Sequence, residues 1–264
     1  MMTEFINNLK KRNEMLFYFG LICLVSSIVF LALTQFSNLQ VYNVSAWYKP
    51  FKFAFSIFLF AWTMAWYCYY LPSFNINYFN WTVIILLGFE IVYIAFQANK
   101  GQLSHFNLST PVYATLYIAM ALAASLVTIY TAYIGILFFK FDFPALPNNY
   151  LWAIRLGILI FVVFSFEGFV MGSRLTHTIG GESGGAAIPL LNWSTKFGDP
   201  RIAHFIGMHA LQVLPLLSYY LFKNTKATIA VAILYGLLAN FTLIQALQSK
   251  PLFKFKHQQN DIIK

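Results

Sequence analysis

Charged residues are scarce in this chain of 264 residues: Asp, Glu, Lys and Arg make up 9% of it, whereas 59% is hydrophobic. A soluble domain usually carries about 25% charged residues, so a soluble globular fold is excluded. Only two cysteines occur, Cys23 and Cys68, and both lie inside apolar runs, which favours free buried thiols. The net charge of +9 comes mostly from Lys and Arg near the ends of apolar runs. That placement is typical of membrane flanks and does not indicate nucleic-acid binding.

Long apolar runs are what the chain does contain. A transmembrane helix needs about 20 predominantly apolar residues, and seven segments meet this requirement. The sequence therefore predicts an all-α integral membrane protein, a bundle of seven transmembrane helices in one domain over residues 1–264. Its expected partners are the lipid bilayer and a small-molecule or lipid substrate. The predicted spans are residues 15–36, 51–72, 80–98, 110–139, 150–172, 201–222 and 226–249.

Strongly polar residues within these spans gather toward one end of the predicted bundle. Seven spans place the two termini on opposite sides, and we call the C-terminal side the C face. Glu90, Glu167 and His209 lie within roughly 12 Å of that face at the rise of a helix. Polar side chains inside lipid are costly and tend to be functional. The sequence therefore predicts a site near the C face and an opposite half with almost no polar groups.

The segment GDPRIAHFIGMHALQVLP, residues 198–215, has the densest polar pattern. Its polar side chains fall on one arc of roughly 140° when they are placed on a helix. Such an arc faces protein or water and not lipid. Pro215 removes the usual helical donor of the Leu211 carbonyl, so we expect a kink there and a bound water or ligand group on that carbonyl. The residues on the arc are Arg201, His204, His209 and Gln212.

Four of the five histidines lie at or near the C face, which suggests a metal or haem site. Imidazole ligates zinc, copper, iron and haem. The chain has no HExxH, CxxC or HxxxH pattern, so hydrogen-bonded structural histidines are the alternative. The cofactor stays open between a transition metal and a single haem. The candidate ligands are His105, His177, His204 and His209.

Glu90 and Glu167 are the carboxyl groups that lie in apolar sequence. They are the candidate catalytic residues, because a membrane carboxyl can relay protons or act as a general acid. The alternative is structural pairing with a cation. That partner would be Arg174 for Glu167, and Lys52 or Lys100 for Glu90.

The loop 173–200 carries four glycines, which permit positive φ and a close approach of the backbone to a ligand. It also holds His177, Glu182 and Trp193. We interpret it as an ordered lid over a polar cavity, with a plain flexible linker as the alternative. Arg174 or Arg201 would hold an anionic group of the substrate.

The segment WYKPFKF, residues 47–53, places Lys49 and Lys52 at the start of the second span. Two interpretations are open: lysines that snorkel to the membrane interface, or lysines that bind an anionic head group. Gln212 and Asn240 complete the predicted substrate-binding residues, because both are polar amides inside apolar spans.

Four segments, KPFKFAFS, GFEIVYIAFQANKGQLSHFN, HTIGGESGGAAIPLLNWS and GDPRIAHFIGMHALQVLPLL, resemble a group of uncharacterised bacterial polytopic membrane proteins. The resemblance covers about residues 47–217 and implies a multi-pass protein of the bacterial inner membrane. It assigns no activity and no catalytic residue. The residues themselves favour a metal- or haem-dependent membrane oxidoreductase with a pocket open to the C face. The alternatives are a proton-coupled transporter or channel, and a ligand-binding membrane sensor.

Overall fold

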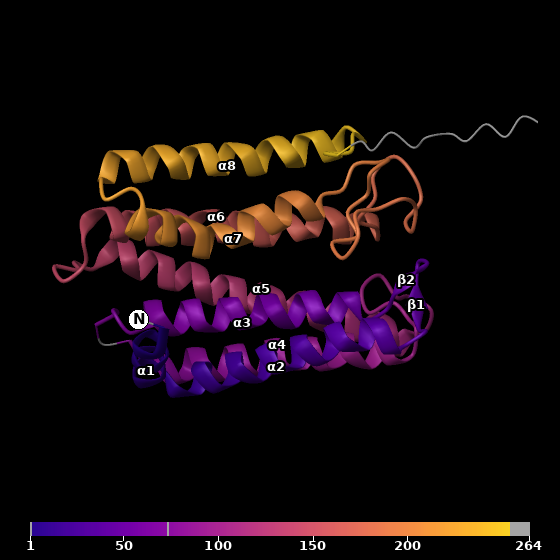
Figure 1. Cartoon of the computed structure of the whole chain (residues 1–264), viewed down its shortest axis with the longest axis horizontal. Helices are drawn as coiled ribbons and strands as arrows, with labels where there is room; N and C mark the ends of the chain where they lie inside the picture. The colour runs from indigo at the N-terminus through magenta and orange to yellow at the C-terminus, as the bar shows by residue number, and fades with distance from the viewer. Residues whose placement is uncertain (1, 73, 254–264) are drawn as a thin grey trace, which may run out of the picture.

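The computed structural model describes residues 2–72 and 74–253 and is a bundle of long helices (Figure 1). Among these residues, seven helices are long and apolar enough to cross a membrane, which confirms the predicted architecture of an integral multi-pass membrane protein. They are α2 (Glu14–Phe36), α3 (Tyr48–Cys68), α4 (Ile76–Asn99), α5 (Pro111–Lys140), α6 (Asn148–Arg174), α7 (Arg201–Tyr220) and α8 (Thr225–Leu247).

Capping side chains and prolines set several of the helix ends. The side chains of Asn13, Thr110 and Asn224 each accept a backbone N–H of the first turn, at the starts of α2, α5 and α8. The start of α3 at Tyr48 lies before the predicted residue 51. Pro50 is accommodated in the first turn of that helix, where its missing N–H costs no helical hydrogen bond.

A short helix at the N-terminus, α1 (Met2–Arg12), was not predicted. It packs on α3 through aromatic contacts: the Phe5 and Trp66 ring centroids are 5.3 Å apart. The Arg12 guanidinium lies 3.6 Å from the centroid of the Trp66 ring, within cation–π range. The basic segment before the first span is therefore a helix bound to the bundle.

A small hairpin between α2 and α3, formed by β1 (Gln40–Val41) and β2 (Val44–Ser45), was not predicted either. Its turn residues Tyr42 and Asn43 have φ of 55° and 63°. Positive φ at both central positions is the geometry of a two-residue hairpin turn. The hairpin lies at the C face, where it borders the loop 173–200.

Helices α6 and α7 pack closely because glycines face each other's helix. A Cβ on Gly157 would lie 2.9 Å from the Ala210 carbonyl oxygen, and a Cβ on Gly207 would collide with Phe164. Small residues let membrane helices approach closely, since lipid gives no hydrophobic drive for their association. This packing sets the position of the polar residues on the first half of α7.

Pro215 lies inside α7, and the carbonyl that it deprives of a donor is satisfied by protein. The Tyr67 hydroxyl, from α3, donates to the Leu211 carbonyl oxygen at 2.7 Å. The expectation that a bound water or ligand satisfies this carbonyl is therefore wrong. The Tyr67 side chain extends from α3 to α7, so it both satisfies this carbonyl of α7 and joins the two helices.

The half of the bundle near the N-terminus contains more polar groups than expected. Asn13 and Asn80 are both buried and exchange two side-chain hydrogen bonds, of 2.8 and 3.0 Å. Arg155 donates to the Phe138 carbonyl oxygen at 2.8 Å. These groups have protein partners, so they act in packing and leave the C face as the place for a site.

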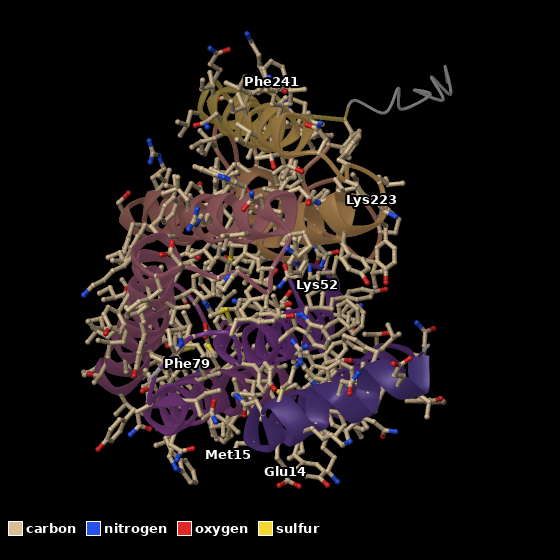
Figure 2. The ribbon with its side chains drawn as sticks, turned by 90° about the vertical axis from the view of Figure 1, so that its left-hand side faces the viewer. Glu14, Met15, Lys52, Phe79, Lys223 and Phe241 are labelled. Carbon is tan, nitrogen blue, oxygen red and sulfur yellow. The ribbon has the colours of Figure 1, made fainter. Side chains whose placement is uncertain are left out.

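The loop 173–200 and the β1–β2 hairpin gather at one end of the bundle, away from the N-terminus (Figure 1). Figure 2 looks along the helices, and there Lys52 lies inside the outline of the bundle and not on its rim. The C face is thus covered by two connections, with basic side chains beneath them.

Candidate functional site

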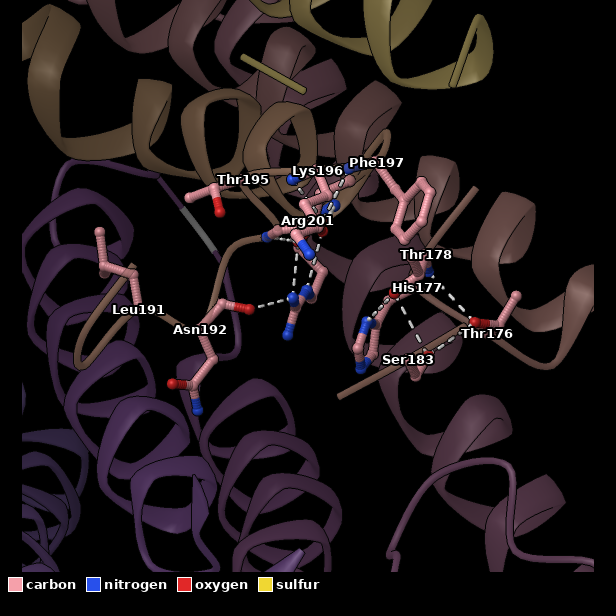
Figure 3. A network of polar contacts seen from close by, with 12 residues as sticks. Thr176, His177, Thr178, Ser183, Leu191, Asn192, Thr195, Lys196, Phe197 and Arg201 are labelled. Atoms are coloured by element: carbon pink, nitrogen blue, oxygen red, sulfur yellow. Dashed lines mark hydrogen bonds and ion pairs between the residues drawn. The ribbon is translucent and has the colours of Figure 1, made fainter. Parts of the chain in front are cut away.

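The loop 173–200 is held in shape by its own hydrogen bonds. The backbones of Ile179 and Gly198 exchange N–H···O bonds of 2.9 and 3.1 Å, which closes the base of the loop. A second bridge joins Ala187 and Ser194. Figure 3 shows the Ser183 hydroxyl between those of Thr176 and Thr178, at 3.0 and 3.2 Å.

The same loop is fastened to the helices around it. The Lys52 ammonium, from α3, donates to the Leu191 carbonyl oxygen at 2.8 Å. At the other side, Gly198 lies so close to Ala246 of α8 that a Cβ would be 2.9 Å from the Ala246 Cα. These contacts join the loop to both sides of the C face, as a cover would require.

Asp199 and Arg201 form the ion pair that anchors the end of the loop at α7. Asp199 is 1% exposed, and its carboxylate oxygens accept from the Arg201 guanidinium at 2.6 and 2.8 Å. The Ser194 backbone N–H also donates to Asp199, at 2.9 Å. Arg201 donates in addition to the Asn192 carbonyl oxygen (Figure 3). Arg201 was predicted to bind substrate, but most of its N–H donors form hydrogen bonds with the loop.

Asp199 was missed as a site residue, although the sequence contains a usable signal. An Asp just before a helix commonly accepts backbone N–H groups of the first turn. Here its carboxylate accepts from the Arg201 N–H at 3.2 Å. The Asp-Pro-Arg run at residues 199–201 therefore indicates a helix start with a built-in ion pair.

Lys49 and Lys52 lie one turn apart on α3 and are both half-buried beneath the loop. Within residues 2–72 and 74–253, neither ammonium forms an ion pair. Glu90 of α4, which is 6% exposed, is within electrostatic range of Lys49 but not in contact with it. The alternative pairing of Glu90 with Lys52 or Lys100 is not formed, because Lys100 turns outward over the Phe96 ring.

His105 and His177 reach the same region from two different loops. The pKa of His177 is lowered to about 3, first by burial and then by the positive charge of Arg201, with Lys49 and Lys52 adding to the effect. The pKa of His105 is also well below its usual range, because of burial and the charge of Lys49. Both imidazoles are therefore neutral at neutral pH, first because they are buried and then because of the cations around them.

His204 of α7 lies against Glu167 of α6, with 3.4 Å between His204 Nδ1 and Glu167 Oε2. The pairing of Glu167 with Arg174 was wrong. Arg174 is exposed at the end of α6 and donates to the Val170 carbonyl oxygen of its own helix. Glu167 and Arg174 are seven residues apart on α6, which separates them by roughly 10 Å along the helix. Helix α7, in contrast, brings His204 into contact with Glu167.

His209 and Gln212 are neighbours on α7, with His209 Nδ1 and Gln212 Oε1 3.4 Å apart. His209 packs edge-on against Phe205, with centroids 4.4 Å apart, and is electrostatically coupled to His204. Asn240 does not join them. It is exposed on α8 and donates to the Gly236 carbonyl oxygen of its own helix at 2.9 Å.

No group of three or more His, Cys, Asp or Glu side chains is arranged to hold a metal ion in the described part of the chain. His105, His177 and His204 are near enough to affect one another electrostatically, yet they do not converge on a common point of ligation. The metal-ligand hypothesis for the four histidines therefore finds no support in the geometry.

A hollow of about 560 Å³ lies on the loop, and neither Lys49, Lys52 nor any of the four candidate histidines lines it. It is bordered by the tip of the β1–β2 hairpin and by the turn Gly181–Gly185, and it is open to its surroundings. Exposed Glu182 and Lys196 line it. The buried polar groups of the C face lie beneath the loop and do not line this hollow.

No family model, no curated protein and no solved structure matches this chain. The resemblance to a bacterial group stays a prediction, and the function is argued below from the side chains at the C face.

Proposed function

We propose that this membrane protein binds a small oxyanion, carried by a soluble molecule or by a lipid head group, beneath the loop 173–200. One observation carries the proposal: Lys49 and Lys52 are half-buried and have no ion-pair partner within the described residues. An ammonium that leaves water without a counter-charge costs several kcal/mol of free energy. A bound anion would supply that counter-charge.

The positions of the two lysines fit a binding role better than snorkelling. A snorkelling lysine extends its ammonium to the membrane surface. Lys52 instead directs its ammonium to the Leu191 carbonyl of the covering loop. An anion that contacts Lys52 would therefore lie beside the loop, with the charge of Arg201 also near.

Glu90 is the competing counter-charge inside the protein. It is buried and within electrostatic range of Lys49, but it makes no ion pair with either lysine. Asp199 is already committed to Arg201. The proposed site is thus surrounded by more cationic than anionic side chains, which favours an anionic ligand over a cationic one.

The metal- or haem-dependent oxidoreductase stays a prediction without a ligand group among the described residues to support it. Transport stays a prediction as well. The polar groups described above in the half of the bundle near the N-terminus form hydrogen bonds within the protein, so they give no support to a transport path. Anion binding requires neither a cofactor nor a continuous polar path. It is also compatible with the predicted sensor.

Binding can be tested by thermal unfolding of the purified protein in lipid nanodiscs. We expect either sodium sulfate in phosphatidylcholine nanodiscs or phosphatidylglycerol in the nanodisc itself to raise Tm. A ligand at 100 times its Kd stabilises the folded state by about 2.7 kcal/mol. A response to sulfate indicates a soluble anion, and a response to phosphatidylglycerol alone indicates a head group.

The matched variants are Lys49→Gln with Lys52→Gln, and Lys100→Gln as the control. Lys100 is exposed at the same face, over Phe96, so its loss changes the overall charge but not the site. The double variant should lose the anion-induced rise in Tm, and the control should keep it. A wild type that responds to neither anion, or a double variant that responds like the wild type, would overturn the proposal.

A further inference from the structure

The Glu167–His204 pair joins a buried carboxylate to an imidazole that is 30% exposed, although the Nδ1 atom of that imidazole is buried. The Glu167 side chain is 4% exposed, and neither of its oxygens makes a hydrogen bond within the described residues. His204 Nδ1 is likewise buried without a well-aligned bond, although Glu167 Oε2 is 3.4 Å away. The contact is close, and its alignment is poor for a hydrogen bond.

Helix packing holds the two groups together. Gly168, beside Glu167, leaves room for the His204 ring: a Cβ there would lie 3.3 Å from His204 Cε1. Ala203 and Phe164, the neighbours that complete this part of α6 and α7, are buried. An unsatisfied carboxylate in such a setting costs free energy, and a proton held between carboxylate and imidazole would remove that cost.

Lys49 of the proposed anion site and His204 of this pair are both within electrostatic range of His105, which links the two electrostatically. Other titratable or charged groups on that side are Lys52 of α3, Glu90 of α4, His177 of the loop and the Asp199–Arg201 ion pair. On the deeper side are His209 of α7 and Tyr235 of α8, whose hydroxyl donates to the Ile206 carbonyl oxygen.

We propose that the Glu167–His204 pair takes up one proton when the oxyanion binds beneath the loop, so that the site binds anion and proton together. The inference rests on the proposed function. The proton comes from water at the C face and forms an N–H bond at His204, with Glu167 as its carboxylate partner. The added positive charge offsets one negative charge of the anion, which keeps the charge change inside the membrane small.

Two other histidines at the C face are poor proton acceptors. Burial and the neighbouring cations lower the pKa of His177 to about 3, and that of His105 is also well below its usual range. Neither forms an ion-pair contact with a carboxylate in the part of the chain that the structure describes. His204 is the one histidine of the described residues that forms an ion-pair contact with a carboxylate.

The test is the pH dependence of anion binding, measured by the same rise in Tm with sulfate or with phosphatidylglycerol. Both probes stay ionised between about pH 8 and about pH 6, so a change in affinity reports on the protein. If binding takes up one proton, the apparent Kd falls by up to roughly tenfold for each unit by which the pH is lowered. We expect the wild type to bind the anion more tightly at the lower pH.

His204→Gln and Glu167→Gln should each flatten this pH dependence, and His177→Gln, at the same face, should keep it. Two variants are used because either one alone could fold poorly. Anion binding that is independent of pH in the wild type would overturn the inference while leaving the proposed function intact. A slope that survives in both variants would also overturn it, because the proton would then go elsewhere, Lys49 and Lys52 included.

Discussion

Single polar atoms in the interior of this bundle are mostly matched one to one. The Tyr67 hydroxyl serves the Leu211 carbonyl that Pro215 leaves without a helical donor. Asn13 and Asn80 satisfy each other. Lipid offers no other hydrogen-bond partners, so the loss of one partner would leave the other polar group unsatisfied at its full cost in free energy. Both oxygens of Glu167 are among the buried side-chain atoms of the described residues that have no such match, and Glu167 is the one carboxyl group among them.

Replacing Tyr67 by Phe should destabilise the protein without changing its shape. The ring stays, and the Leu211 carbonyl loses its donor in a buried site. An unsatisfied buried acceptor costs about 1–3 kcal/mol. The measurement is thermal unfolding in nanodiscs, with Tyr133→Phe as the control, because Tyr133 is 50% exposed and forms no side-chain hydrogen bond within the described residues. Equal Tm values for the two variants would contradict the assigned role of Tyr67.

At the scale of elements, the connection between α6 and α7 behaves as a folded unit and not as a linker. It has its own backbone bridges, an ion pair at its end and a hydrogen bond to α3. Its glycines differ in what they do. Gly180 has φ of 95° and Gly198 touches α8, whereas Gly185 has open space around its α-carbon.

Gly198→Ala should loosen the loop from α8, because its Cβ would collide with the Ala246 carbonyl. Overpacking of this kind costs roughly 1–3 kcal/mol. Hydrogen exchange at the Ile179 amide, which donates to the Gly198 carbonyl oxygen, would report the change as lost protection. Gly185→Ala is the matched control and should exchange like the wild type. Unchanged protection in Gly198→Ala would refute the close packing of loop and helix.

At the scale of the whole molecule, seven spanning helices give the protein two different faces. The face near the N-terminus holds α1, with Arg12 over the Trp66 ring, and short connections. The C face holds the hairpin and the long loop (Figure 1). Ligand access is expected from the C face alone, since Lys49 and Lys52 lie there.

An odd number of spans puts the two termini on opposite sides of the membrane. Reporter fusions at the N-terminus and at the C-terminus should therefore give opposite signals in intact cells. A third fusion in the connection 141–147, between α5 and α6, should report the same side as the N-terminal one. Signals from both termini on one side would contradict the seven-span topology and the depths of Glu90, Glu167 and His209.

The sequence alone determined the number and approximate limits of the spans, because about 20 apolar residues in a row have one stable form in lipid. It also located the polar residues near the C face, since depth along a helix follows from residue number. It could not decide which helices are neighbours. Only the packing of α6 on α7 pairs Glu167 with His204, and only the placement of α8 leaves Asn240 exposed on its outer side. Contacts between helices depend on glycines such as Gly157, whose meaning appears only once the opposing helix is in place.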